Sequence, residues 1–423
     1  MDGDMPEESS DMAWRVLGQA LKFMNRDQEL WWLQTAPFFN QLLIQCGYPV
    51  ESQYHYLCFY HRHILPVLGP FIRPGVSADN ISLFTPEGYP LELSVNYQQS
   101  HSIVRLGCGP VSEFAGTVHD PLNQFKAREL LGRLALLDSN IDLRWFDYFA
   151  SQLTVTIEEA NLASHHLIPP LRQTNEVAFD LKEEGIVPKG YFFLKPKSIV
   201  TGVPTGVLAF DAIERLDAHF HASLAVLKEF LLPWLDAQND SDAAVSDVFL
   251  IGFDCVIPRK SRIKLYVVNT HLSFDNVRAL WTLGGRFDDP VTTKGLLIAE
   301  KLWSVLHFKE LSYADMDADQ LPLAVYYEMK HGGTAPKPQL YLPLHGVNDD
   351  FIADALTKFF EYLEWGGFAA RYKQELISNF PCHDIKQTKT AQRWVSFSYT
   401  EPAGVYLTVY FHPVQGKIGS LPL

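Results

Sequence analysis

The chain has 423 residues, of which 47% are hydrophobic and 20% charged, a composition typical of a globular protein with a large core. Its formal net charge of −14 argues against a nucleic-acid-binding protein, because such proteins need a broad basic face. No segment reaches the ~20 apolar residues that a membrane span requires. We therefore expect a protein that binds neither nucleic acid nor membranes, and that has room for a small basic site.

Cysteine usage and the composition of the first residues indicate a reducing compartment. The cysteines are odd in number and none forms a CxxC pair: Cys46, Cys58, Cys108, Cys255 and Cys382. This spacing favours neither a disulfide framework nor a zinc site with cysteine ligands. Residues Met1–Ser10 are polar and acidic, without the apolar stretch of a signal peptide. We expect a cytoplasmic protein.

Helical and strand-like segments alternate along the whole chain. In order, hydrophobic periodicity predicts two helices, two strands, a helix, a strand, a helix and a strand at Gln28–Gly47, Tyr54–Leu68, Leu91–Tyr97, Ile103–Cys108, Gln124–Leu137, Gly190–Lys195, Val207–Leu235 and Arg262–Val268. Two helices, a strand, a helix and two strands follow at Asn276–Leu283, Thr293–His307, Gln339–Leu344, Asp349–Asn379, Trp394–Tyr399 and Val405–Phe411.

The predicted strands alternate polar and apolar residues, which is typical of an antiparallel sheet with one solvated face and one face covered by helices. Strands of a parallel βαβ sheet would be apolar nearly throughout. No long Pro-, Gly- or Ser-rich linker divides the chain. We therefore predict one domain over residues 1–423, with residues 1–28 as a partly flexible N-terminal segment.

The polar face of these strands contains basic, amide and phenolic residues. Side chains two residues apart share one face of a strand, so each strand presents its set in one direction. The sets recur every 67 to 84 residues, which indicates a degenerate internal repeat. Closing the strands into a barrel would direct all of them into one lumen: Arg105, Lys189, Arg262, Lys264 and Gln339, with Tyr191, Tyr266, Tyr341, Tyr406 and Tyr410.

Four cations in one lumen are costly unless an anion compensates them. Arginine and lysine both suit phosphate oxygens, and aromatic faces stabilise cations. Such a lumen could ionise an allylic diphosphate and shelter the resulting carbocation. Taken singly, each basic strand motif is more often a solvent-exposed face, and tyrosines on strands often reflect β-propensity alone. Their regular recurrence favours the lumen.

Metal-binding motifs are weak in this sequence. Asp288 and Asp289 are followed by Pro290, so the DDxxD motif that clamps a diphosphate through magnesium is missing, and we interpret the pair as a helix N-terminus. His219 and His221 flank one residue in a predicted helix, so they face different sides. We expect no metal cofactor.

Several segments together resemble the fungal aromatic prenyltransferases of the dimethylallyltryptophan synthase type. They are Lys189–Phe193, Ser261–Tyr266, Pro338–Tyr341, Tyr406–Tyr410, Pro90–Ser94 with Val104 and Arg105, and Leu280–Gly285. The resemblance runs from about residue 29 to the C-terminus. It implies an α+β fold, the ABBA barrel, in which ten antiparallel strands surround a solvent-filled lumen and helices ring it in repeated ααββ units.

The resemblance also implies a metal-independent enzyme of secondary metabolism, specifically of indole alkaloid biosynthesis. It would transfer the dimethylallyl group of dimethylallyl diphosphate to an indole by Friedel–Crafts alkylation. The basic residues and Gln339 would bind the diphosphate, the five tyrosines would shield the cation, and Glu92 would accept the indole N–H. The partners are these two small molecules, and a homodimer is compatible with the resemblance.

The acceptor stays open at this stage. Gly107 would leave room for a tryptophan-containing cyclic dipeptide, although a tight turn would explain this glycine equally well. A phenolic or xanthone-type acceptor is an alternative, because Glu92 could also activate a phenol. A further alternative is a non-catalytic barrel that carries a hydrophobic anion, for which a carboxylate at Glu92 would have no use.

Overall fold

The computed structural model describes residues 12–72, 82, 88–163, 173–236, 247–269, 272–308, 323–381 and 383–412. Within these residues the strands form one closed barrel in which every neighbouring pair is antiparallel, and β1 pairs with both β2 and β10. The strands are β1 (Leu91–Tyr97), β2 (Ser102–Cys108), β3 (Asn175–Lys182), β4 (Gly185–Phe193), β5 (Asp247–Asp254), β6 (Arg262–Asn269), β7 (Leu323–Lys330), β8 (Lys337–Pro343), β9 (Gln392–Thr400) and β10 (Gly404–Phe411). The predicted ten-stranded barrel is confirmed.

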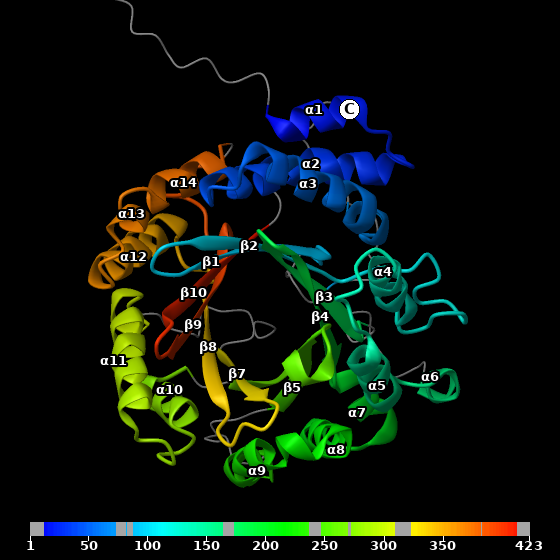
Figure 1. Ribbon diagram of the computed structural model, residues 1–423, viewed down its shortest axis with the longest axis vertical. Helices are drawn as coiled ribbons and strands as arrows, with labels where there is room; N and C mark the ends of the chain where they lie inside the picture. The colour runs from blue at the N-terminus through cyan, green and yellow to red at the C-terminus, as the bar shows by residue number, and fades with distance from the viewer. Residues whose placement is uncertain are drawn as a thin grey trace, which may run out of the picture.

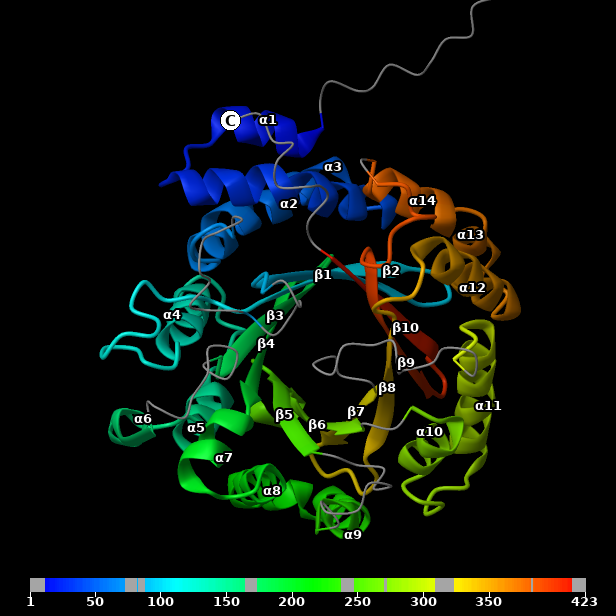
Figure 2. The ribbon, with the colours of Figure 1, turned by 180° about the vertical axis from the view of Figure 1, so that it is seen from behind.

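Helices surround this barrel on its outer side, as Figures 1 and 2 show from opposite directions. They are α1 (Ala13–Ala20), α2 (Arg26–Gln45), α3 (Val50–Phe59), α4 (Phe125–Ala135), α5 (Arg144–Leu153), α6 (Ile157–Ala163), α7 (Lys195–Thr201), α8 (Thr205–Leu216), α9 (His221–Asp236), α10 (Phe274–Trp281), α11 (Pro290–Val305), α12 (Asp349–Tyr362), α13 (Gly366–Ala369) and α14 (Tyr372–Asn379). Each strand hairpin follows a group of helices in the chain. None of the helices in the described part of the chain has the length and apolar character needed to cross a membrane.

Alternation along the strands separates the lumen from the core. Outward-facing side chains such as Leu93, Phe179 and Phe253 are fully buried under the helices. Each such side chain contributes roughly 1.5–3 kcal/mol to folding. Inward-facing side chains are largely polar, and a barrel of ten strands is too wide for them to fill. The predicted division into one helix-covered face and one solvated face is therefore correct.

Two predicted helices are interrupted in the structure. Val207–Leu235 is divided into α8 and α9 because Asp217 is extended, with φ −163°, and caps a 3₁₀ turn at Ala218–Phe220. Asp349–Asn379 is divided into α12, α13 and α14, with Glu364 in the left-handed region at φ 61°. Helical periodicity continues through both breaks, so these boundaries could not be predicted from it.

Three strands were not predicted: β3, β5 and β7. β5 and β7 are short, mostly apolar runs, and periodicity alone does not distinguish such a run from a helical segment. β3 does alternate, with Val177, Phe179 and Leu181 on one face, and this signal was missed. The N-cap interpretation of Asp289 is confirmed, because its side chain accepts the backbone N–H groups of Val291 and Thr292 at the start of α11.

The remaining predictions concern the thiols and the N-terminus. Cys46, Cys58, Cys108 and Cys255 are free thiols, while Cys382 lies outside the described residues. Of the N-terminal segment 1–28, residues 1–11 also lie outside the described residues, and α1 begins at Ala13.

Candidate active site

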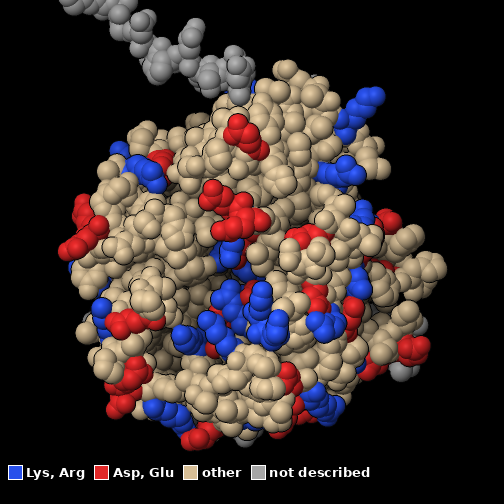
Figure 3. All heavy atoms as spheres, viewed as in Figure 1, with Lys and Arg blue, Asp and Glu red and all other residues tan. Residues whose placement is uncertain are grey.

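The lumen of the barrel contains a cavity of about 670 Å³ lined by side chains from all ten strands. Figure 3 shows Lys and Arg side chains gathered in the central hollow of one face. Every predicted site residue lines this cavity: Glu92, Arg105, Lys189, Arg262, Lys264, Gln339, Tyr191, Tyr266, Tyr341, Tyr406 and Tyr410. The barrel therefore brings together residues that are more than 300 positions apart in the chain.

Asp180 on β3 holds two of the four cations. The Arg105 Nε atom lies 2.8 Å and the Lys189 Nζ atom 2.5 Å from its Oδ1 atom. The three residues are on neighbouring strands, with Arg105 directly opposite Asp180 in the β2–β3 register. Burial would raise the pKa of Asp180, but Arg105 and Lys189 hold it below its usual range. The aspartate is therefore ionised and orients both cations.

Two further carboxylates hold the other two cations. Arg262 donates to Asp254 on β5 and to Glu328 on β7, each at 2.7 Å. The Lys264 Nζ atom lies 3.6 Å from Asp254. Despite burial, which acts in the opposite direction, Lys264 and Arg262 lower the pKa of Asp254 to about 2. The three carboxylates thus compensate part of the positive charge of these four cations.

Sequence reasoning missed these three carboxylates because each lies on a strand that was not predicted. Once β3, β5 and β7 are placed, the two-residue period directs Asp180, Asp254 and Glu328 inward. The cavity is lined by further cations, Lys182, Lys330 and Lys337. Cations therefore outnumber the paired carboxylates, and the lumen keeps an excess of positive charge suited to an anionic ligand.

The tyrosines form a continuous aromatic layer beside the cations. The Tyr266 ring lies 6.2 Å from Tyr191 and 6.0 Å from Tyr341, measured between ring centroids. Tyr410 donates a hydrogen bond of 3.1 Å to the Tyr341 oxygen. Arg105 lies over the Tyr406 ring at 5.2 Å and donates to its hydroxyl.

A sixth tyrosine, Tyr326 on β7, completes this layer and was not predicted. Its ring lies 5.0 Å from Tyr266, and the Lys264 ammonium lies 5.7 Å from it. The Tyr326 hydroxyl donates to the Gln339 carbonyl oxygen, and the Gln339 amide donates to Ser396 at 2.8 Å. These bonds fix the orientation of the glutamine amide.

A pair of carboxyl groups lies elsewhere on the lumen wall. Glu92 is on β1 and Glu176, which was not predicted, is on β3. Burial raises the pKa of Glu92 to about 8, against the opposing influence of Arg393. Burial and the neighbouring Glu92 raise the pKa of Glu176, which accepts a 2.9 Å hydrogen bond from Gln173. This region is less basic than the cation cluster, which comprises Arg105, Lys189, Arg262 and Lys264. Its two carboxyl groups can accept a proton when they are ionised.

Gly107 lies opposite Glu92 in the β1–β2 register and lines the cavity. It is within strand β2, so the interpretation as a tight turn is wrong. Because glycine has no side chain, this position contributes only backbone to the cavity wall beside Glu92.

A closed antiparallel barrel ringed by helices, with this lumen at its centre, is the fold of the ABBA aromatic prenyltransferases. The sequence model of one protein family, described as Tryptophan dimethylallyltransferase, matches residues 27–375. The chain belongs to this family.

Similar proteins and similar solved structures support the same family membership. The chain is 54% identical over 411 residues to "Indole diterpene prenyltransferase anaPT" of Neosartorya fischeri, covering 97% of this chain and 93% of the relative. It is 41% identical to "Trans-prenyltransferase abpB" of Aspergillus terreus, covering 85% and 92%. The crystal structure of AnaPT superposes with a TM-score of 0.89, covering 97% of this chain and 100% of that one. NotF in complex with brevianamide F and DMSPP gives 0.84 at 30% identity, covering 96% and 99%.

Proposed function

We propose that this prenyltransferase transfers the dimethylallyl group of dimethylallyl diphosphate to an indole acceptor by Friedel–Crafts alkylation. The observation that carries the proposal is the presence, in one lumen, of an oriented cation cluster, an aromatic layer and the Glu92 carboxyl. The indole prenyltransferase name of the relative at 54% identity supports the same acceptor class.

The cation cluster would bind the diphosphate and stabilise it as it leaves. Arg105, Lys189, Arg262 and Lys264 are held by carboxylates within hydrogen-bond or ion-pair distance, so little reorganisation is needed when the anion enters. As the C–O bond of the donor breaks, its electron pair leaves with the diphosphate oxygen. Preorganised charges aimed at such developing charge are usually the largest contribution to catalysis.

The tyrosine layer would protect the dimethylallyl cation from water, and its ring faces would stabilise the positive charge. Burial raises the pKa of the tyrosine hydroxyls at positions 191, 266 and 341 well above their usual value, so these rings stay neutral. The Gln339 carbonyl oxygen accepts from Tyr326, and one amide N–H of Gln339 donates to Ser396. The second amide N–H would donate to the diphosphate.

The Glu92 carboxylate would accept the indole N–H and thereby increase the electron density of the ring. The ring carbon then forms a bond to the allyl cation, and the proton on that carbon must leave for aromaticity to return. Glu92 and Glu176 are the carboxyl groups of this lumen region that are not paired with the cation cluster. We assign the proton to this pair.

The acceptor is proposed to be tryptophan-derived, and the absence of a side chain at Gly107 favours an acceptor larger than tryptophan, such as a tryptophan-containing cyclic dipeptide. The experiment is incubation with dimethylallyl diphosphate and single acceptors, namely tryptophan, such cyclic dipeptides and phenols, with products read by mass spectrometry. An indole product supports the proposal, and a product from phenols alone contradicts the acceptor class. Tight binding of dimethylallyl diphosphate without release of diphosphate would instead support the alternative of a non-catalytic carrier.

Activity is expected to persist without divalent metal, because the cation cluster supplies the positive charge that magnesium supplies elsewhere. Turnover should be equal in EDTA and in added magnesium. Loss of turnover in EDTA that magnesium restores would contradict this prediction. We also propose a cytoplasmic location, which the free thiols of the described residues support. Size-exclusion chromatography would test whether the chain forms the homodimer that the resemblance allows.

A pH dependence follows from Glu92. With a pKa of about 8, this carboxyl is mostly protonated at pH 7 and ionised at pH 9. If the carboxylate is the active form, kcat/KM for the acceptor at saturating diphosphate should rise roughly tenfold between about pH 7 and pH 9. The Glu92→Gln variant should lack this rise. An equal rise in the variant would assign it to another group.

A side chain at position 107 should lower the size of the acceptor that the site can hold. Gly107→Val places two methyl groups beside Glu92 in an extended segment that accepts β-branched residues. We expect turnover of cyclic dipeptides to fall relative to that of free tryptophan, measured as the ratio of the two kcat/KM values. An unchanged ratio would place the acceptor away from this wall.

A further inference from the structure

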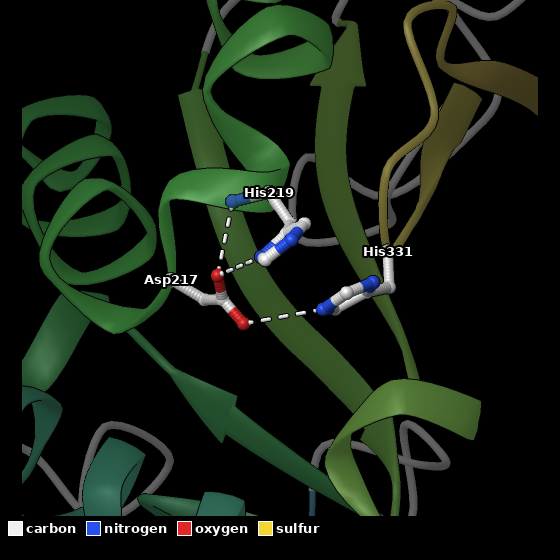
Figure 4. Close-up of side chains that lie close together, drawn as sticks. All are labelled: Asp217, His219 and His331. Carbon is white, nitrogen blue, oxygen red and sulfur yellow. Dashed lines mark hydrogen bonds and ion pairs between the residues drawn. The ribbon is translucent and has the colours of Figure 1, made fainter.

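Asp217, His219 and His331 form a cluster that does not line the lumen cavity. Figure 4 shows the three side chains converging, two from the segment between α8 and α9 and one from the turn after β7. The Asp217 Oδ1 atom is 2.7 Å from His219 Nδ1, and its Oδ2 atom is 3.5 Å from His331 Nε2. One atom from each residue lies within 4.8 Å of the others.

The surrounding structure holds the two segments in this arrangement. The Gly332 N–H donates to the His219 carbonyl at 3.2 Å, and the Ser223 hydroxyl donates to the Gly333 carbonyl at 2.6 Å. Phe220 is fully buried and meets the His331 ring edge-on at 6.2 Å. The ligand groups are therefore positioned by contacts that do not depend on the cluster itself.

The chemistry of the cluster matches a transition-metal ion better than it matches a purely structural contact. The imidazole rings of His219 and His331 are stacked, 3.8 Å apart at an interplanar angle of 21°, and both present a ring nitrogen to the Asp217 carboxylate. The His219 backbone N–H donates to the Asp217 Oδ1 atom at 2.9 Å, and this bond would remain when a metal replaced the ring proton.

We infer that Asp217, His219 and His331 bind one divalent ion of the zinc type, with a fourth position left to water. Two imidazoles and one carboxylate suit zinc and its neighbours, whereas magnesium and calcium prefer oxygen ligands alone. Ligand atoms of tetrahedral zinc lie about 3.4 Å apart, so modest side-chain rotation completes the site. The ion would join the α8–α9 segment to the β7–β8 turn, outside the catalytic lumen.

The sequence places His221 next to His219, whereas the structure brings His331 to His219. In the structure His221 points elsewhere and contacts the Glu214 carbonyl oxygen at 2.8 Å. It is exposed, close in sequence and absent from the cluster, which makes His221→Ala a matched control for His219→Ala.

The test uses the full chain, stripped with EDTA and desalted, and titrated with zinc chloride by calorimetry at pH 7.5. We expect one zinc ion per chain in the wild type and in His221→Ala. Affinity should fall roughly tenfold or more in His219→Ala and in His331→Ala. Saturating zinc should raise the melting temperature of the wild type by about 2–5 °C, and magnesium should not.

Absence of stoichiometric zinc binding by the wild type would overturn the site, as would unchanged affinity in either histidine variant. A folded state for each variant is checked by circular dichroism. Should His331→Ala fail to fold, His331→Gln replaces it, because glutamine keeps a polar group there and is a poor zinc ligand. Prenyl transfer in EDTA is measured alongside, so failure of this site is distinguishable from failure of the proposed function.

Discussion

The Glu92→Gln variant is expected to turn over roughly 10²–10³-fold more slowly than the wild type, with nearly unchanged affinity for dimethylallyl diphosphate. Glutamine preserves the size of the side chain but cannot act as an anionic acceptor for the indole N–H. The residue lies opposite Gly107 and is not among the ion-pair partners of the cation cluster. Removing its charge should therefore alter the chemical step and leave diphosphate binding intact.

The measurement is steady-state kinetics with the true acceptor, together with the affinity for a non-ionising thiolodiphosphate analogue. Glu176→Gln is the informative companion, because this residue is the second carboxyl of the pair. Near-full activity of Glu92→Gln would remove the residue from the mechanism. A large loss of analogue affinity would indicate that Glu92 organises the lumen rather than the acceptor.

In the Lys264→Ala variant we expect the apparent KM for dimethylallyl diphosphate to be about 10–150-fold higher than in the wild type. A charge-assisted hydrogen bond contributes about 1.5–3 kcal/mol, and each 1.4 kcal/mol corresponds to a factor of ten. Lys264 is only 4% exposed and lies between β5 and β7 of a closed barrel. The alternative interpretation of this basic strand motif, a solvent-exposed face, is therefore wrong.

Folding should survive this substitution, because Asp254 keeps its 2.7 Å contact with Arg262. The matched control is Lys260→Ala, which removes an exposed lysine just before β6 and should leave kinetics unchanged. The KM for the aromatic acceptor should change less than the KM for dimethylallyl diphosphate. Wild-type kinetics for a folded Lys264→Ala would exclude Lys264 from the diphosphate site.

The sequence was sufficient to predict the barrel and its basic and phenolic residues. Strands with a two-residue polar period, such as Arg262–Tyr266, specify one inward face without reference to the rest of the chain. Arg105 and Lys264 could be assigned to that face on this ground, and the family resemblance supplied the closed topology. Helix α2 and the cap at Asp289 were likewise predicted, because their signals are local.

Features that depend on strand neighbours were decided only by the tertiary structure. Asp180 lies 75 positions from Arg105, and Glu328 lies 66 positions from Arg262, so no local pattern joins these carboxylates to those cations. The same holds for His219 and His331, whose stacking requires the turn after β7 to reach the break between α8 and α9. Periodicity determines which way a side chain points, because it is set by the backbone of one element. Which charge it meets is set by barrel closure and register, and these exist only once the whole chain has folded.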